Sequence, residues 1–219
     1  MKLFVGLFVA LVMLTSCSAE GSHSHPADVK AELSENQTVF HGRFLDEPFP
    51  LPSANFKDTF GTDVSWPDDP MPADVTVVFF GYTNCADGYC HTQTANVAAA
   101  IRGLSQSDQS RVNFVFVTTD PPRDSAAVLR TYLDLYNTKF IGLRASIREI
   151  QNAGLALGVH VDDIPDPLPT SNYEVGHGLQ LFAFLQDKTS PLFWMEDNSV
   201  QEIRQDLKTL LKGEWQKNG

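Results

Sequence analysis

Two cysteines, Cys85 and Cys90, lie between an apolar run and an alanine-rich segment, and this junction constrains the fold more than any other feature of the chain. The run over residues 75–80 predicts a buried strand, and residues 94–104 predict a helix. Thiols at a strand-to-helix turn lie where helix N-terminal amides and the helix dipole favour thiolate, which is both the nucleophile and the metal ligand. The pair therefore indicates redox chemistry, soft-metal binding or both. Its four intervening residues differ from the Cys-x-x-Cys spacing that favours a dithiol oxidoreductase.

The order of the remaining elements predicts the fold class. Short strands are expected over residues 38–66, where prolines and turn formers separate isolated aromatics. The elements expected after them are a strand at 75–80, a helix at 93–104, a strand at 112–118, a helix capped by Asp124 and running to 136, a strand at 140–143, a helix opened by Ser146 and reaching 157, a hairpin of 179–186 and 192–195, and a closing helix that begins at Ser199. With a cysteine directly after the first core strand, this order predicts a thioredoxin-like α/β sandwich: a central mixed sheet flanked by helices, with an N-terminal strand extension.

The N-terminal residues have the pattern of a targeting segment. Lys2 supplies the positive charge, residues 3–14 supply an apolar stretch that is short for a membrane span, and residues 14–17 supply a cleavage region. This resembles a bacterial lipoprotein signal over residues 1–16, in which cleavage leaves Cys17 to be lipidated. The alternative is an ordinary secretory signal. In either case we expect export, and the lipid would anchor the protein to a bacterial membrane on its periplasmic or extracytoplasmic side.

Two further segments follow the signal. Residues 17–36 are small and polar and are expected to form a flexible tether, whose His23 and His25 are interpreted as incidental or as loose metal ligands. Residues 37–219 are expected to form the thioredoxin-like domain. The formal charge of −11, from 27 acidic and 16 basic residues, argues against nucleic acid as a ligand.

The number of cysteines narrows the role of the pair. The chain has three, and with Cys17 assigned to the anchor only Cys85 and Cys90 remain. Outside the cytoplasm an idle pair tends to oxidise, but cross-linking so short a loop stabilises a fold little. We therefore interpret the pair as chemical rather than architectural.

A metal site needs more than two thiolates. Two sulfurs and one imidazole suit Cu(I), which accepts soft, low-coordinate sites. The candidate imidazoles are His41, His91, His160 and His177. His177 has a glycine on each side and lies just before the strand expected at 179–186. In a thioredoxin-like fold, the loop before that strand lies against the turn that carries the two cysteines, residues 85–90, called the cysteine turn below. A surface-loop histidine is the alternative.

Four segments together resemble the Sco (SenC/PrrC) family, thioredoxin-like copper-binding proteins that help assemble the copper site of cytochrome c oxidase. The segments are residues 79–85, 115–124, 139–143 and 173–177. They occur in the family's order and spacing, and the similarity extends from about Phe44 to the C-terminus. The set is specific, although each segment alone is weak.

The resemblance implies a ligand set. The family's cysteine ligands fall on Cys85 and Cys90, and its histidine ligand falls on His177. Its acid after the second core strand falls on Asp120, and Asp87 matches an acid between the cysteines. We expect Asp120 to hydrogen-bond near the site and to help hold His177 or a cysteine, with an ordinary turn residue as the alternative.

The chain departs from the family in the cysteine turn. The usual pattern is Cys-Pro-Asp-x-Cys-Pro, whereas this chain has Cys-Ala-Asp-Gly-Tyr-Cys-His, with one residue more and neither proline. Gly88 is expected to absorb the insertion by a backbone conformation that other residues avoid. His91 is either a second nearby imidazole or a helix-start residue that faces solvent.

The leading hypothesis is a membrane-tethered copper metallochaperone. It would carry Cu(I) or Cu(II) and deliver it to the copper site of a cytochrome oxidase subunit, with a thiol reductant or another copper chaperone as further partners. The acidic, proline-rich connection over residues 160–176 is the expected docking surface. This hypothesis does not require the protein to be an enzyme.

Two alternatives belong to other classes. The first is an extracytoplasmic thiol-disulfide oxidoreductase, with Cys85 as the attacking thiolate and Cys90 as the resolving one. The second is a structural domain that has lost the chemistry. Retention of all three candidate ligands argues against the second.

Overall fold

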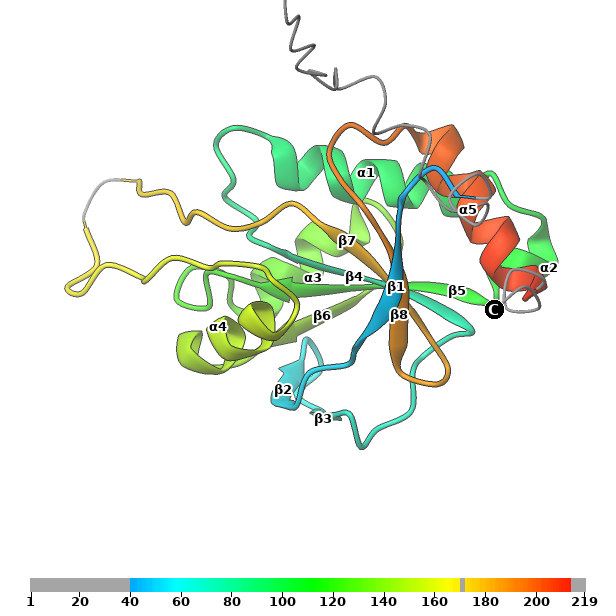
Figure 1. Ribbon diagram of the computed structural model, residues 1–219. Coiled ribbons are helices and arrows are strands. Elements are labelled where there is room, and N and C mark those ends of the chain that lie inside the picture. The colour runs from blue at the N-terminus through cyan, green and yellow to red at the C-terminus, as the bar shows by residue number, and fades with distance from the viewer. Residues whose placement is uncertain (1–39, 170–171, 214–219) are drawn as a thin grey trace, which may run out of the picture. The chain divides into compact units, whose positions relative to one another are not determined.

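A mixed eight-stranded sheet forms the centre of residues 40–169 and 172–213, which the computed structural model describes (Figure 1). They belong to the chain's larger unit, Ser34–Gly219. The strands are β1 (Arg43–Pro50), β2 (Ala54–Asp58), β3 (Asp63–Trp66), β4 (Val75–Gly81), β5 (Val112–Thr118), β6 (Ile141–Arg144), β7 (Leu181–Leu185) and β8 (Thr189–Trp194). Their spatial order is β1-β8-β7-β4-β5-β6-β2-β3.

The central strands β4 and β5 run parallel, from the pair Val75 and Val112 to the pair Gly81 and Thr118. Every residue of β4 is buried. A parallel strand covered on both faces has this continuous apolar sequence instead of alternation. The carboxyl ends of β4 and β5 therefore lie side by side, and each continues into a loop that leads to a helix.

Five helices accompany the sheet in the described residues. They are α1 (Tyr89–Arg102), α2 (Gln106–Gln109), α3 (Ala126–Asp134), α4 (Ile147–Ala156) and α5 (Val200–Lys212). The first of these, α1, packs against α5, and the two lie side by side in Figure 1. It also meets α3, where the Thr94 hydroxyl lies 3.0 Å from that of Tyr132. Helix α1, which begins at the cysteine turn, is thus fixed by two other helices.

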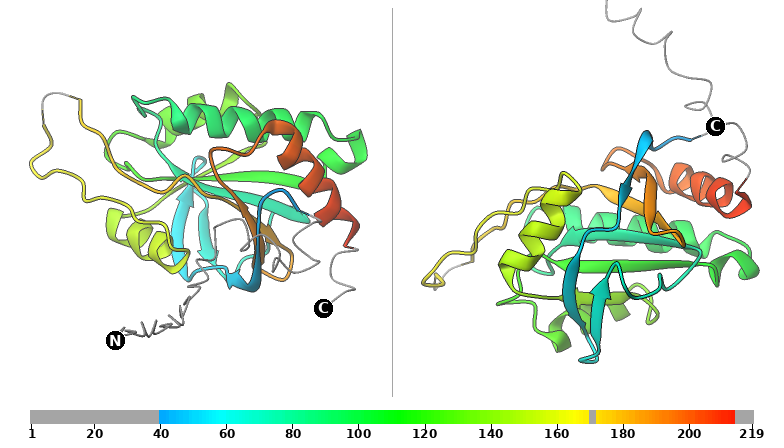
Figure 2. Two further views of the ribbon diagram at one scale, coloured as in Figure 1. Left: turned by 45° about the horizontal axis from the view of Figure 1, so that its top comes forward. Right: turned by 60° about the horizontal axis from the view of Figure 1, so that its bottom comes forward.

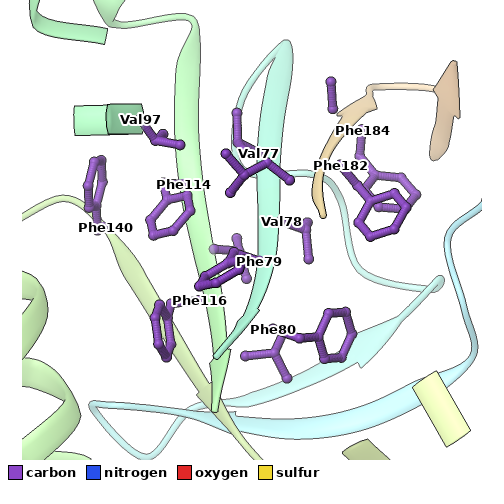
Figure 3. Packing of buried hydrophobic residues seen from close by; sticks show 14 of the residues in the cluster. Val77, Val78, Phe79, Phe80, Val97, Phe114, Phe116, Phe140, Phe182 and Phe184 are labelled. Atoms are coloured by element: carbon purple, nitrogen blue, oxygen red, sulfur yellow. The ribbon is translucent and has the colours of Figure 1, made fainter. Parts of the chain in front are cut away.

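Aromatic side chains fill the core beneath the carboxyl ends of the central strands (Figure 3). Phe79 and Phe116 are fully buried and meet at 5.7 Å between ring centroids, in an edge-to-face arrangement. Phe116 also contacts Tyr132 of α3 at 5.4 Å. Such rings bury large apolar areas and favour offset or edge contacts. This packing supports the cysteine turn on a rigid part of the core.

One long connection, over residues 157–180, joins α4 to β7. Figures 1 and 2 show its described parts running out from the sheet and back. In its described residues, 157–169 and 172–180, it has one short piece of β-structure, an antiparallel bridge between Val161 and His177. The amide of Asp162 donates to Gly176 O at 2.9 Å and that of Gly178 to His160 O at 3.2 Å, so the bridge closes the base of the connection.

The thioredoxin-like fold class and the N-terminal strand extension are confirmed. The extension supplies both sheet edges, since β1 pairs with β8 while β2 and β3 extend the sheet beyond β6. The two strands of the predicted hairpin also pair, as β7 and β8. The Ser199 side chain and Glu202 form a reciprocal capping box at the start of α5.

Two helix starts were predicted wrongly. Helix α1 begins at Tyr89 and not at residue 93, because Gly88 provides the turn that starts it. Helix α3 is capped by Ser125, whose side chain accepts from Val128 N, and not by Asp124. Asp124 is buried and accepts instead from the hydroxyls of Thr83 and Thr118, each at 2.6 Å.

Several predictions fall on residues that lie outside the described ones. They are the signal at 1–16, the tether at 17–36, the lipidation site Cys17, and His23 and His25. Among residues 40–169 and 172–213, the longest helices fall short of the length and apolar character that a bilayer crossing requires.

Candidate metal centre

Cys85, Cys90 and His177 converge at the carboxyl end of β4. One ligand atom of each lies within 4.8 Å of the others. The Sγ atom of Cys90 is 3.3 Å from Nε2 of His177, although 87 positions separate them in the chain. Both cysteines are buried and reduced, and the histidine is half-buried. The structure thus brings together the three side chains singled out from the sequence.

The cysteine turn accommodates its extra residue through Gly88. This glycine has φ +78°, in the left-handed region that favours glycine, as predicted. Its amide donates to Cys85 O at 3.2 Å, and its carbonyl accepts from Thr92 N at 2.9 Å. The turn therefore closes on itself and passes directly into α1, which places Cys90 in the first helical turn.

The two thiols have different acidities. A hydrogen bond with the Cys90 thiol is the main reason that the pKa of Cys85 falls from 9.0 to about 5, against the opposing effect of burial. His177 and the Cys90 amide, whose nitrogen is 3.3 Å from Cys85 Sγ, also lower the pKa of Cys85. The same thiol pairing, together with burial, raises the pKa of Cys90. Cys85 is therefore the first thiolate to form.

Asp87 contacts the centre directly. Its Oδ1 lies 2.9 Å from Cys85 Sγ and accepts from Tyr89 N at 3.0 Å. The hydrogen bond with Cys85 is the main cause that lowers the pKa of the Asp87 carboxyl. Asp87 raises the pKa of Cys85, which moderates the acidity of that thiol.

His177 is oriented for binding through Nε2. Its Nδ1 lies 2.9 Å from Gly178 O, a partner that can only accept, so Nδ1 carries the proton. This leaves the Nε2 lone pair available on the side of Cys90. The ring packs edge-on against Phe79 and Tyr82, with centroids at 5.9 and 5.7 Å. The backbone fixes the tautomer and the two aromatic rings fix the orientation, a common arrangement for metal-binding histidines.

The expected contact of Asp120 with His177 or a cysteine is absent from the hydrogen bonds of the described residues. Asp120 Oδ1 accepts instead from the Tyr173 hydroxyl at 2.7 Å, and Oδ2 accepts from Arg123 Nε. Asp120 is fully buried at the end of β5, so these bonds satisfy a carboxylate that has no access to water. Any influence on the metal centre passes through its partners.

The remaining described histidines lie outside the cluster. His91 Nδ1 is 3.3 Å from the Tyr136 hydroxyl, so this residue contacts protein rather than facing only solvent. His41 pairs with Asp206 at 2.9 Å and His160 with Asp162 at 3.0 Å. The choice of His177 among the four candidates is the one that the geometry supports.

Sequence reasoning missed three residues beside the centre. Tyr82 packs on His177, and Arg123 and Tyr173 contact Asp120. All three lie inside the segments on which the family resemblance depends. That position was the available signal, but no local pattern indicates that they contact one another.

The donor set suits a soft metal ion. Two thiolates and one imidazole nitrogen match the preference of Cu(I), whereas structural zinc sites are almost always four-coordinate. The described residues supply three donors at this point. The acidity of Cys85 and the free Nε2 lone pair provide ligands in the protonation states that a metal needs.

A sequence model described as SCO1/SenC matches residues 53–212. The chain belongs to the SCO1/SenC family. Protein SCO1, mitochondrial, of Saccharomyces cerevisiae is 30% identical over 112 residues, which are 51% of this chain and 37% of that relative. The chain spans less than half the length of the first curated relatives it matches.

Solved structures of the SCO1/SenC family share the fold. Apo Sco1 of Thermus thermophilus is 26% identical, with a TM-score of 0.67 over 78% of this chain and 96% of that one. Arabidopsis thaliana ScoI with copper bound is 23% identical, with a TM-score of 0.64 over 76% and 98%. BsSco, described as having a disulfide switch and as a member of the Sco family of cytochrome c oxidase assembly proteins, is 18% identical, with a TM-score of 0.58 over 77% and 97%. The last two likenesses concern the fold alone.

Proposed function

We propose that this SCO1/SenC protein binds one copper ion through Cys85 Sγ, Cys90 Sγ and His177 Nε2 and delivers it to the copper site of a cytochrome oxidase subunit. The observation that carries the proposal is the convergence of these three atoms within 4.8 Å. Membership of the SCO1/SenC family, whose proteins bind copper and help assemble the copper site of cytochrome c oxidase, supports copper as the cargo and the oxidase as the recipient.

The residues divide the work of binding and release. Cys85 provides a thiolate at neutral pH because its pKa lies near 5. Cys90 is fully buried and loses its proton when the metal binds, because a metal ion favours the thiolate. His177 is the more exposed ligand, so a recipient site can exchange with the imidazole first and with the thiolates afterwards. Asp87 adjusts the pKa of Cys85. Asp120 would influence the site through Tyr173 and Arg123, which it contacts.

We further propose that the protein works at a membrane surface. Residues 1–16 would be a lipoprotein signal, Cys17 the lipidated residue, 17–36 the tether and 37–219 the domain that carries the site. The acidic, proline-rich part of the connection, residues 160–176, would contact the recipient. Metabolic labelling with a fatty acid analogue tests the anchor: incorporation should disappear in Cys17→Ser and persist in Cys85→Ser.

Copper loading of the reduced domain tests the metal site. The wild type should bind one Cu(I) in competition with a chromophoric chelator, Cys85→Ser and Cys90→Ser should lose stoichiometric binding, and His177→Ala should bind more weakly. His160→Ala is the matched control, because this histidine lies on the same connection but outside the cluster. Unchanged binding in the three ligand variants would overturn the proposal.

The acidity of Cys85 supports one second function, thiol-disulfide exchange with Cys85 attacking and Cys90 resolving. Insulin reduction measures it. Turnover that requires both cysteines and is indifferent to His177→Ala would favour the oxidoreductase. Copper binding that depends on all three ligands, without turnover, would favour delivery.

A further inference from the structure

A cluster of three side chains, Asp120, Arg123 and Tyr173, lies beside the metal centre. The Tyr173 hydroxyl donates to Asp120 Oδ1 at 2.7 Å. The central guanidinium carbon of Arg123 lies 3.6 Å from the centroid of the Tyr173 ring, and Arg123 Nε donates to the other oxygen of Asp120. Tyr173 is therefore held at its hydroxyl and on its ring face by partners that also bind each other.

The anchor of this cluster is part of the rigid core. Asp120 is fully buried, and its amide donates to Thr118 Oγ1 at 3.1 Å, at the end of the central strand β5. The Arg123 side chain is 22% exposed. Its two terminal nitrogens are buried without a hydrogen-bond partner among the described residues. The guanidinium therefore relies on the Asp120 carboxylate and the Tyr173 ring, and desolvation strengthens a cation–π contact.

The anchored tyrosine lies only four residues before His177. Val175, between them, is buried, and the backbone of Gly176 and Gly178 makes the hydrogen bonds of the bridge between Val161 and His177 that closes the base of the connection. Arg123 also lies 5.6 Å from the ring centroid of Tyr82, which packs perpendicular to the His177 ring. The cluster thus meets the histidine along two routes, one through the chain and one through Tyr82.

We propose that Asp120, Arg123 and Tyr173 form a latch that holds the connection against the β5–α3 turn and thereby fixes His177 over the two cysteines. The three are positioning residues, since their contacts run to one another and to the connection. Without the latch, His177 would occupy its binding position for a smaller fraction of the time, and the apparent affinity for the metal falls in proportion to that fraction. The copper consequence rests on the proposed function, whereas the positional one concerns the metal-free protein.

The positional consequence is tested by NMR on the reduced, metal-free protein. The wild type should show cross-relaxation between the His177 ring and the rings of Phe79 and Tyr82, which lie within 6 Å. Tyr173→Leu removes the ring and the hydroxyl and should weaken these contacts, and Tyr173→Phe, which keeps the stack, should weaken them less. Tyr136→Phe is the matched control, because it removes a hydroxyl that contacts His91 instead. Full retention of the contacts in a folded Tyr173→Leu protein would overturn the latch.

The copper consequence is tested by a double-mutant cycle on Cu(I) affinity. Tyr173→Leu should weaken binding about tenfold, a typical loss for a residue that supports a ligand. In a His177→Ala background the same change should have no effect, because no ligand remains for the latch to hold. Equal losses in both backgrounds would overturn the proposal.

The two experiments separate failure of the latch from failure of the proposed function. If the wild type itself binds no copper, or if the cysteine variants bind as it does, the copper proposal fails. The NMR contacts still decide the latch in that case. If the wild type binds copper through all three ligands but Tyr173→Leu is unchanged in affinity and in NMR contacts, the latch fails alone.

Discussion

The two sides of the metal centre are built differently. The cysteine side consists of the junction of β4 and α1, where every strand residue is buried and Cys90 already lies within the helix. The histidine side consists of the 157–180 connection, whose described residues form one isolated β-bridge and a few side-chain contacts. The positions of the two sulfurs follow from secondary structure and core packing. The position of the imidazole depends instead on a small number of backbone and side-chain contacts.

This difference assigns separate tasks to the two sides. A preorganised thiol pair binds without first ordering a loop, which lowers the cost of metal capture. An imidazole held by a few contacts can leave and return without disturbing the core. For the proposed delivery, the cysteine side retains the ion and the histidine side controls its exchange.

The largest expected contrast concerns the acidity of Cys85. Thiolate absorbance of the metal-free protein should appear as the pH rises through about 5, and only near 9.0 after unfolding. Because the folded pKa is the lower one, this group stabilises the fold fully above pH 9, and that contribution is lost as the pH falls to about 5. Cys90→Ala should move the transition toward 9.0 by more than His177→Ala, since the Cys90 hydrogen bond is the main cause. A larger shift in His177→Ala than in Cys90→Ala would mean that the histidine is the main cause of the low pKa of Cys85.

Removing a core ring should affect stability far more than removing an apolar side chain from the connection. Phe79→Ala should lower the free energy of unfolding by about 3–5 kcal/mol, because the ring is fully buried and contacts Phe116. Leu168→Ala, at a residue that is half exposed, should change it by about 0.5 kcal/mol or less. Urea denaturation measures both variants. Similar losses would show that the connection belongs to the cooperative core.

The buried carboxylate of Asp124 joins the cysteine turn to β5. It accepts from the hydroxyls of Thr83 and Thr118 and from the Thr83 amide. Asp124→Ala leaves the fully buried Thr118 hydroxyl and the partly buried Thr83 donors without this acceptor and should cost about 2 kcal/mol in the free energy of unfolding. Asp134→Ala, at a partly exposed partner of Arg130, is the control and should cost about 0.5 kcal/mol. A loss at Asp124 as small as the control would contradict this role.

The smallest expected effect concerns the backbone of the cysteine turn. Gly88→Ala places a Cβ in open space but at φ +78°, so it should cost about 1 kcal/mol through backbone strain. Gly103→Ala is not a clean control, because its Cβ would meet Arg204. Gly88→Asn is a better comparison, since asparagine tolerates this conformation. Thermal unfolding should show that Gly88→Asn recovers part of the stability that Gly88→Ala loses.

Local sequence patterns were sufficient to predict the strands of the core and the starts of α4 at Ser146 and of α5 at Ser199. The meeting of Cys85, Cys90 and His177 was also predicted, but the family resemblance was needed for it, since the order of elements alone left His177 as one of four candidate histidines. Patterns failed where the partner is distant in sequence. Asp124 resembles a helix cap locally, but its partner Thr83 is 41 positions away.

The latch shows the same limit. Tyr173 and Asp120 are 53 positions apart, and neither has a neighbourhood that indicates the other. The start of α1 was missed for a different reason. A single left-handed residue, Gly88, determines where the helix begins, while hydrophobic periodicity becomes clear only after the first helical turn.

The closed turn at Gly88 has a consequence for how such proteins are recognised. A search pattern that demands three residues between the cysteines would reject this chain, although Cys85, Cys90 and His177 still converge on one point. A backbone hydrogen bond from Gly88 to Cys85 closes a tight turn over Ala86 and Asp87, two of the four intervening residues, so spacing in the sequence and separation in space are uncoupled at this turn. Surveys that count proteins of this kind by motif alone would therefore undercount them, and surveys by three-dimensional distance would not.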